Sequence, residues 1–84
     1  MNFKFLSGKV EYDRHNTIWR TKTGRQTPIF WMTNTHLENC LRCLNGQGES
    51  EIPDPYFGKS KREWIGIFET ELSIRREENV RTPN

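Results

Sequence analysis

The C-terminal third of the chain restricts the fold more than any other feature, because it has the pattern of one long amphipathic helix. The segment from residue 60 to about residue 78 begins with Ser60-Lys61-Arg62-Glu63, a capping box in which a serine oxygen and a glutamate side chain satisfy the first backbone N–H groups. Glu69, Glu71 and Arg76 lie outside the apolar face or at its edge. Such a helix must bury that face against the rest of the chain. At about 100° per residue, roughly half of the circumference is occupied by large apolar side chains, namely Trp64, Ile65, Ile67, Phe68, Leu72 and Ile74.

A second, shorter helix is predicted over residues 35–44. Thr35-His36-Leu37-Glu38 is another capping box, and Asn45-Gly46 is a typical C-terminal stop. A helix of about ten residues is stable only when it packs on something. The apolar positions that would pack recur at helical spacing, at Leu37, Cys40, Leu41 and Leu44.

The N-terminal half has the pattern of an antiparallel meander. Alternating apolar and polar residues predict a strand over residues 2–12, and β-branched and aromatic residues predict a second over residues 17–21. Gly24 is placed to supply the positive φ of the following turn. A third strand is predicted over residues 25–31, at an edge of the sheet because Pro28 cannot donate a hydrogen bond.

These elements predict one α+β domain over residues 1–84, with a small three-stranded antiparallel sheet followed by two helices packed on one face. Residues 45–59 are rich in Gly and Pro and are predicted to form a flexible loop, and residues 80–84 a loose tail. The predicted core consists of Phe3, Phe5, Ile18, Ile29, Leu37, Leu41, Leu44, Trp64, Phe68 and Leu72.

The composition limits what such a domain can be. Only 32% of its 84 residues are hydrophobic, although 3 Trp, 2 Tyr and 5 Phe partly compensate because each ring buries a large area. No apolar window reaches the ~18 residues of a membrane span, and the first ten residues lack the apolar region of a signal peptide. Two cysteines without a secretory signal favour a reducing cytosol. So small a core also predicts that the protein self-associates as a homo-oligomer.

Positive charge gathers in the N-terminal half although the net charge is only +2. Residues 1–48 hold seven Lys/Arg and three acids, and residues 49–84 hold six Lys/Arg and eight acids. Arg forks and a stacking ring between residues 14 and 25 suit a phosphate-bearing ligand, although a solvated hairpin tip would have the same pattern. The candidate binding residues of this segment are Arg14, Trp19, Arg20, Lys22 and Arg25.

The segment Ile52-Pro53-Asp54-Pro55-Tyr56-Phe57 is a second candidate surface. Prolines stiffen it, and rigid loops with aromatic side chains are common at the centres of interfaces. Tyr56 and Phe57 are therefore candidate binding residues. The alternative is that both rings fold back and cover the small core.

Catalysis and metal binding have weaker support. His36, Cys40 and Cys43 fall on one helical stripe, but a structural zinc site usually takes its ligands from two elements. Cys40 also lies on the apolar side of its helix, where a cysteine behaves as a small hydrophobe. The chain shows no nucleophile with a partner base and no phosphate-binding glycine loop before a helix. We therefore expect neither an enzyme nor a cofactor.

The stretch Trp19-Arg20-Thr21-Lys22-Thr23-Gly24-Arg25, with Ile29 and Met32-Thr33-Asn34-Thr35-His36-Leu37-Glu38-Asn39, resembles a group of small bacteriophage-type proteins. Their shared core has the form W-x-T-x-x-G … M-T-x-x-H-L-x-N, and their C-terminal helix is similar to residues 64–75. The longer connection around Tyr56 departs from that group. The group has no agreed activity, so the resemblance assigns no functional residue. It does imply an origin in a phage or prophage genome.

This origin leads to a functional expectation. Small phage accessory proteins commonly bind and disable a host component. We therefore expect a non-catalytic anti-defence inhibitor in the host cytoplasm, whose target is a host defence protein or a nucleotide signal molecule. The alternative is a nucleic-acid-binding phage regulator that uses the basic hairpin around Trp19. The small net charge counts against that alternative.

Overall fold

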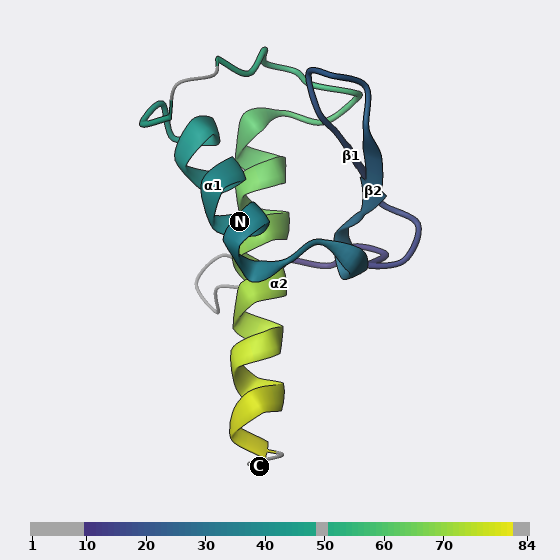
Figure 1. Ribbon diagram of the computed structural model, residues 1–84, viewed down its shortest axis with the longest axis vertical. Coiled ribbons are helices and arrows are strands. Elements are labelled where there is room, and N and C mark those ends of the chain that lie inside the picture. Colours follow the sequence, from purple (N-terminus) through teal and green to yellow (C-terminus); the bar gives the residue numbers. More distant parts are fainter. Residues whose placement is uncertain (1–9, 49–50, 82–84) are drawn as a thin grey trace.

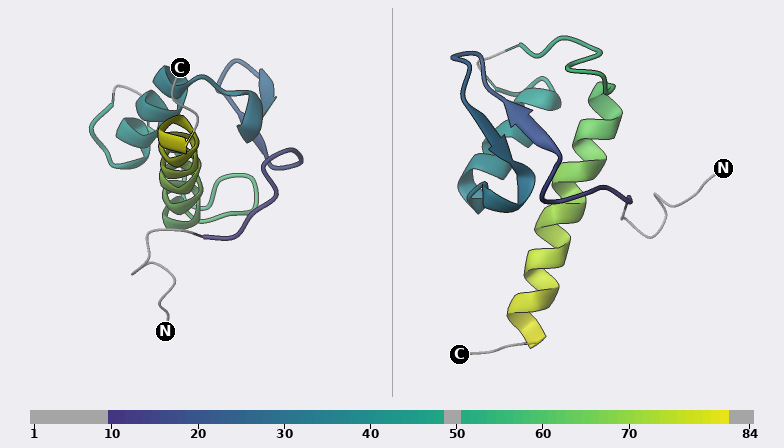
Figure 2. Two further views of the ribbon diagram at one scale, coloured as in Figure 1. Left: turned by 90° about the horizontal axis from the view of Figure 1, so that it is seen from below. Right: turned by 90° about the vertical axis from the view of Figure 1, so that its right-hand side faces the viewer.

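The computed structural model describes residues 10–48 and 51–81 and has a small α+β fold (Figure 1). The helix α1 and a two-stranded hairpin lie against the N-terminal half of the long helix α2, whose C-terminal turns extend beyond both (Figures 1 and 2). No helix within these two ranges is long and apolar enough to span a membrane. The elements follow in the order β1 (Ile18–Arg20), β2 (Gln26–Pro28), the 3-10 helix η2 (Ile29–Trp31), α1 (Asn34–Leu44) and α2 (Lys61–Arg81).

The hairpin is short and tightly turned. Strands β1 and β2 are antiparallel, with Trp19 opposite Thr27. The turn is closed by hydrogen bonds from the Thr21 N–H to the Arg25 carbonyl, at 2.9 Å, and from the Gly24 N–H to the Thr21 carbonyl, at 3.0 Å. Gly24 has a φ of 92°, so its predicted role in the turn is confirmed.

The predicted three-stranded sheet is not confirmed, because the structure has two strands in the residues it describes. Of the strand predicted over residues 2–12, residues 10–12 belong to no strand and the rest lies outside the described residues. The strand predicted over residues 25–31 is also too long, since it ends at Pro28 and the chain turns into η2. Arg75 of α2 stabilises this turn by donating hydrogen bonds to the carbonyls of Ile29 and Phe30, at 3.2 and 3.1 Å.

Helix α1 begins one residue before the predicted range, and its cap is Thr33 instead of Thr35. The Thr33 hydroxyl accepts a hydrogen bond from the backbone N–H of His36, at 3.1 Å. Met32 precedes the cap and Leu37 follows it by four residues, and both are buried in the same core cluster. This arrangement matches a hydrophobic staple, which fixes the direction in which the chain enters a helix.

The predicted stop of α1 and start of α2 are confirmed. Gly46 has a φ of 78°, and its N–H and that of Gln47 donate to the last carbonyls of α1, as in a Schellman motif. At α2, the Ser60 hydroxyl accepts from the N–H of Glu63 at 3.1 Å, and the Glu63 carboxylate accepts from the N–H of Ser60 at 2.8 Å. The helix continues to Arg81, so residues 80 and 81 of the predicted tail are helical, and residues 82–84 lie outside the described residues.

The core lies where α1, η2 and β1 meet α2. Five predicted members are buried, namely Ile29, Leu37, Leu44, Trp64 and Phe68. Ile18, Leu41 and Leu72 are only half-buried, which corrects the prediction, and Phe3 and Phe5 lie outside the described residues. Trp19 takes the place assigned to Ile18: its ring packs edge-on against Trp64 and Phe68, with centroids 5.0 Å apart in both cases.

A buried carboxylate joins the N-terminal segment to α2. Glu71 was expected at the edge of the apolar arc or outside it, but its side chain has no exposed surface. It accepts hydrogen bonds from Nε and Nη2 of Arg14, from Nε of Arg75, all at 2.8 Å, and from the hydroxyl of Tyr12. Burial alone would raise the pKa of Glu71, but the hydrogen bonds from Arg14, Tyr12 and Arg75 outweigh it and lower this pKa to about 2. Glu71 is therefore ionised and fully paired at neutral pH.

Candidate binding pocket

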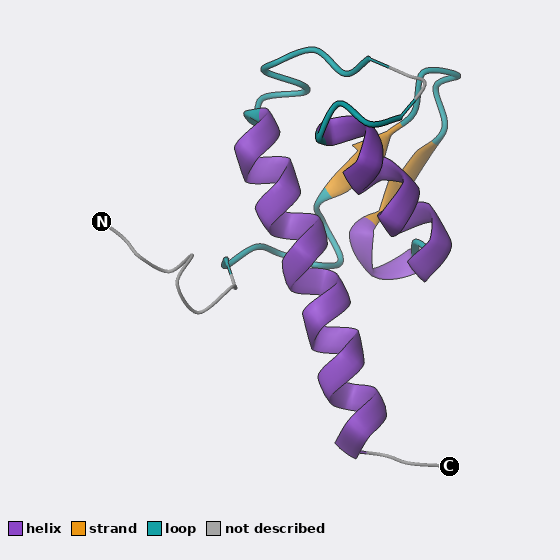
Figure 3. Ribbon diagram, turned by 90° about the vertical axis from the view of Figure 1, so that its left-hand side faces the viewer, coloured by secondary structure: helices purple, strands orange, loops and turns teal. Residues whose placement is uncertain are grey.

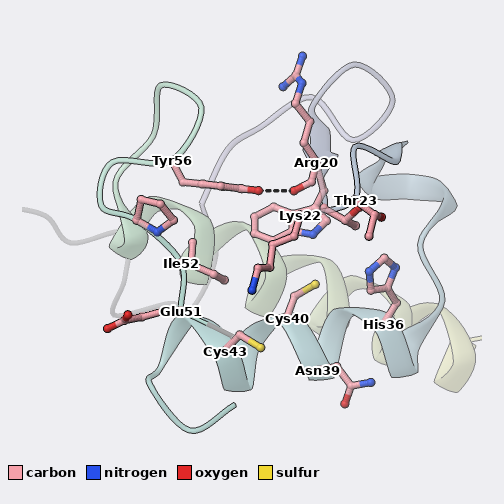
Figure 4. A pocket seen from close by; sticks show the side chains of 13 residues that line it. Arg20, Lys22, Thr23, His36, Asn39, Cys40, Cys43, Glu51, Ile52 and Tyr56 are labelled. Carbon is pink, nitrogen blue, oxygen red and sulfur yellow. Dashed lines mark hydrogen bonds between the residues drawn. The ribbon is translucent and has the colours of Figure 1, made fainter. Parts of the chain in front are cut away.

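A pocket of about 400 Å³ lies between the tip of the hairpin, one face of α1 and residues 51–56 (Figure 4). This volume is near the lower end of the range for small-molecule sites, roughly 300–1,000 Å³. Residues 51–60 run past the hairpin tip before α2 begins (Figures 1 and 3). The members of this segment that line the pocket are Glu51, Ile52, Pro53 and Tyr56. The pocket therefore draws on three segments far apart in sequence.

The aromatic wall of the pocket is fixed by the core. The ring of Tyr56 packs on that of Trp19, with centroids 5.2 Å apart. Its hydroxyl donates a 2.6 Å hydrogen bond to the carbonyl of Arg20, and its own carbonyl accepts a 2.7 Å bond from the indole N–H of Trp64. Tyr56 thus joins the hairpin to α2, and these contacts within the chain hold its ring in place at the pocket wall.

The opposite wall is a stripe along α1. His36, Asn39, Cys40 and Cys43 line the pocket at helical spacing. Burial raises the pKa of the Cys40 thiol to about 12, partly offset by a hydrogen bond from Trp19. Cys40 is therefore a protonated thiol at neutral pH and contributes an apolar surface instead of a nucleophile.

The stripe does not form a metal centre. His36, Cys40 and Cys43 are spread along the wall and do not converge on one point (Figure 4). Among residues 10–48 and 51–81, no three His, Cys, Asp or Glu side chains are grouped to hold a metal ion.

Lys22 is the cation that enters the pocket. It is exposed and lies at the hairpin turn, and its ammonium points between α1 and Ile52 (Figure 4). Arg20 also borders the pocket, but its guanidinium points away and lies 4.7 Å from the ring centre of Phe57. Arg25 is exposed beyond the hairpin turn and does not line the pocket.

The other predicted binding residues differ in their positions. Trp19 lines the pocket beside Tyr56, but only 4% of it is exposed because its ring packs on Trp64 and Phe68 in the core. Arg14 is committed to Glu71 and lies 4.9 Å from the ring centre of Phe30. The two aromatic residues of the second candidate surface differ in burial: Tyr56 folds back on the core, whereas Phe57 remains 55% exposed.

The sequence prediction missed two features of the surface. The α1 stripe was considered only for metal, although its spacing already placed His36 and Asn39 on the same face as Cys43. An aromatic patch on η2 was missed because this segment was assigned to a strand. There Trp31 is 69% exposed and packs on Phe30, which also contacts the ring of His15.

Comparison with protein families, curated proteins and solved structures gives no match for this chain.

Proposed function

We propose that this protein is a non-catalytic phage accessory protein that neutralises a host defence component by binding it, and that the pocket beside Lys22 holds the bound molecule. The observation that carries the proposal is the pocket itself, with rigid apolar walls and one ammonium inside. A concave site of this kind suits a small signal molecule better than a protein surface. The phage context comes from the sequence resemblance.

The chemistry of the walls favours binding over catalysis. The Cys40 thiol is protonated at neutral pH, because burial raises its pKa to about 12. The Tyr56 hydroxyl already donates to a backbone carbonyl. Both groups therefore contribute to the shape of the pocket. We expect a ligand held there to be sequestered instead of converted.

A host protein is a second candidate target, because Phe57 is 55% exposed on a tight turn and Arg20 stacks on it. Aromatic and arginine side chains are enriched at interface centres. The nucleic-acid alternative is weakened by the buried Trp19 ring, and Arg14 is no longer available for phosphates. Binding of DNA or RNA with submicromolar affinity at about 150 mM salt would restore that alternative.

An infection assay tests the proposal. Bacteria that each carry one defence system are challenged with phage, with and without this protein. We expect the protein to raise plaque formation on at least one strain, and Lys22→Glu to abolish the effect. Arg25→Glu is the matched control, because it reverses a charge on the same turn outside the pocket.

A biochemical arm identifies what is bound. Protein purified from the strain on which it raises plaque formation is heated, and the released small molecules are identified by mass spectrometry. We expect a compound that is present with the parent and with Arg25→Glu but absent with Lys22→Glu. A rise in plaque formation that survives Lys22→Glu but is lost with Phe57→Ala would contradict the pocket and favour the protein target.

A further inference from the structure

We infer that the pocket is selective for small organic anions, with a ring-sized apolar body and a single negative charge. This inference rests on the proposed function, since it names the chemical class of the bound molecule. The body would lie against Tyr56, Ile52 and the α1 stripe, and the negative charge would meet Lys22.

The apolar body follows from the walls. Tyr56, Ile52 and Pro53 form one side, and Cys40 forms part of the other as a protonated thiol. At the α1 end, the His36 imidazole can take part in one or two directed hydrogen bonds, whereas the Asn39 amide points away from the pocket and its oxygen accepts a 2.6 Å hydrogen bond from Nη2 of Arg42. A volume of about 400 Å³ limits the ligand to a compact body.

The negative charge follows from the balance of ionised groups. Lys22 has no ion-pair partner among the described residues, and its ammonium points into the pocket. Glu51 also borders the pocket, but its carboxylate points outward (Figure 4). An anion inside would therefore meet an unpaired cation and no opposing carboxylate.

The limit to one charge follows from the position of Arg20. Its guanidinium lies over Phe57 and outside the pocket, so a ligand does not receive an arginine fork. A second charge on the ligand would lie against apolar walls without a partner, which is costly. The geometry thus favours a carboxylate, a sulfonate or a phosphodiester over a polyphosphate.

Two fluorescent probes distinguish the contribution of the apolar body of a ligand from that of its negative charge. The anionic probe is 8-anilino-1-naphthalenesulfonate, and the neutral probe is N-phenyl-1-naphthylamine, which has the same ring system without the sulfonate. Titration of the folded parent is expected to show one site for each probe. Lys22→Ala is expected to weaken the anionic probe about tenfold and leave the neutral probe unchanged, since it removes one charge-assisted contact.

Matched variants locate the site. Ile52→Trp places a large ring where the Ile52 side chain points into the pocket (Figure 4) and is expected to abolish binding of both probes. Glu38→Trp places the same ring on an exposed position of α1 outside the pocket and is expected to retain both. Arg25→Ala is the charge control, and thermal melts of all variants show that each is folded.

The outcomes distinguish the inference from the proposed function. If Lys22→Ala leaves the anionic probe unaffected, or weakens both probes equally, the anion preference is wrong while the pocket remains a binding site. If Ile52→Trp leaves both probes bound, or if the parent binds neither, the pocket assignment in the proposed function fails together with this inference.

Discussion

The cluster around Glu71 and the pocket beside Lys22 lie at opposite ends of the hairpin, and each brings a cation of the N-terminal half to a helix. At the base of the hairpin, the Arg14 guanidinium meets a fully buried carboxylate in a bidentate pair. At the tip, the Lys22 ammonium enters a pocket whose nearest acid, Glu51, points away. A charge that is paired within the chain stabilises the fold, and a charge that is left open is available to a ligand.

The same contrast applies to the two tyrosines. Tyr12 donates its hydroxyl to Glu71, so it helps to close the polar cluster. Tyr56 donates its hydroxyl to the Arg20 carbonyl, and the residue lines the pocket. Because these residue types are shared by both regions, their identity alone does not separate structural from functional sites. The two kinds of site are separated by the hydrogen-bond or ion-pair partner of each polar group.

The largest effect is expected from breaking the closed cluster. Glu71→Gln removes the fully buried carboxylate that pairs with both Arg14 and Arg75 and leaves these two partly buried cations beside a neutral amide. Loss of one partner of a buried pair costs about 3–5 kcal/mol, a large share of the stability of a domain this small. Urea unfolding measures this change. Glu69→Gln, on an exposed position of the same helix, is the control and should cost less than about 0.5 kcal/mol.

Acid should open the same cluster without a mutation. The pKa of Glu71 is lowered from 4.5 to about 2 in the folded protein, so the ionised form is favoured by folding. Its contribution is therefore complete above about pH 5 and is lost as the pH falls toward 2, and it amounts to roughly 3 kcal/mol. Melting temperatures between pH 7 and pH 2.5 measure the loss. A protein as stable at pH 3 as at pH 6 would contradict the paired state of Glu71.

The sequence predicted the helices well and the sheet poorly, for identifiable reasons. The apolar arc and the Ser60 capping box are local patterns, and local hydrogen bonds satisfy them in the structure. A strand of three residues is too short to carry a comparable local pattern. Residues Ile18 and Trp19 point to opposite faces, and only the position of Trp64 and Phe68 across the core decides which of them is buried.

The pocket was only partly predictable for the same reason. Lys22, Arg20 and Tyr56 were recognised as candidates from their types, because cations and rings commonly form binding sites. The direction of each side chain depends on contacts between distant segments: Arg20 turns to Phe57, and the Tyr56 hydroxyl reaches the hairpin backbone. The two residues in each of these contacts are 36 or more positions apart in the sequence, so no local pattern encodes the contact.

A smaller effect is expected at the wall of the pocket. Tyr56→Phe removes the hydroxyl that donates to Arg20 and keeps the ring on Trp19. The loss of one net hydrogen bond should lower the free energy of unfolding by about 0.5–1.5 kcal/mol. Denaturant titration measures it. A loss of more than about 3 kcal/mol would show that the hydroxyl supports the fold as Glu71 does, and would contradict the contrast between the two regions.

The smallest effect on stability, and the sharpest test of the contrast, is expected at the open charge. Lys22 and Arg25 flank the same turn, both are exposed, and neither has an ion-pair partner among the described residues. Replacing either with Ala should change the free energy of unfolding by no more than about 0.5 kcal/mol. Thermal melts of the two variants should therefore overlay that of the parent. The variants should separate only when an anionic ligand is added, because binding to the folded state raises the melting temperature by an amount that grows with the logarithm of the ratio of ligand concentration to Kd. The shift should persist in Arg25→Ala and shrink in Lys22→Ala. If Lys22→Ala is itself destabilised like Glu71→Gln, Lys22 belongs to the fold and the tip of the hairpin is as closed as its base.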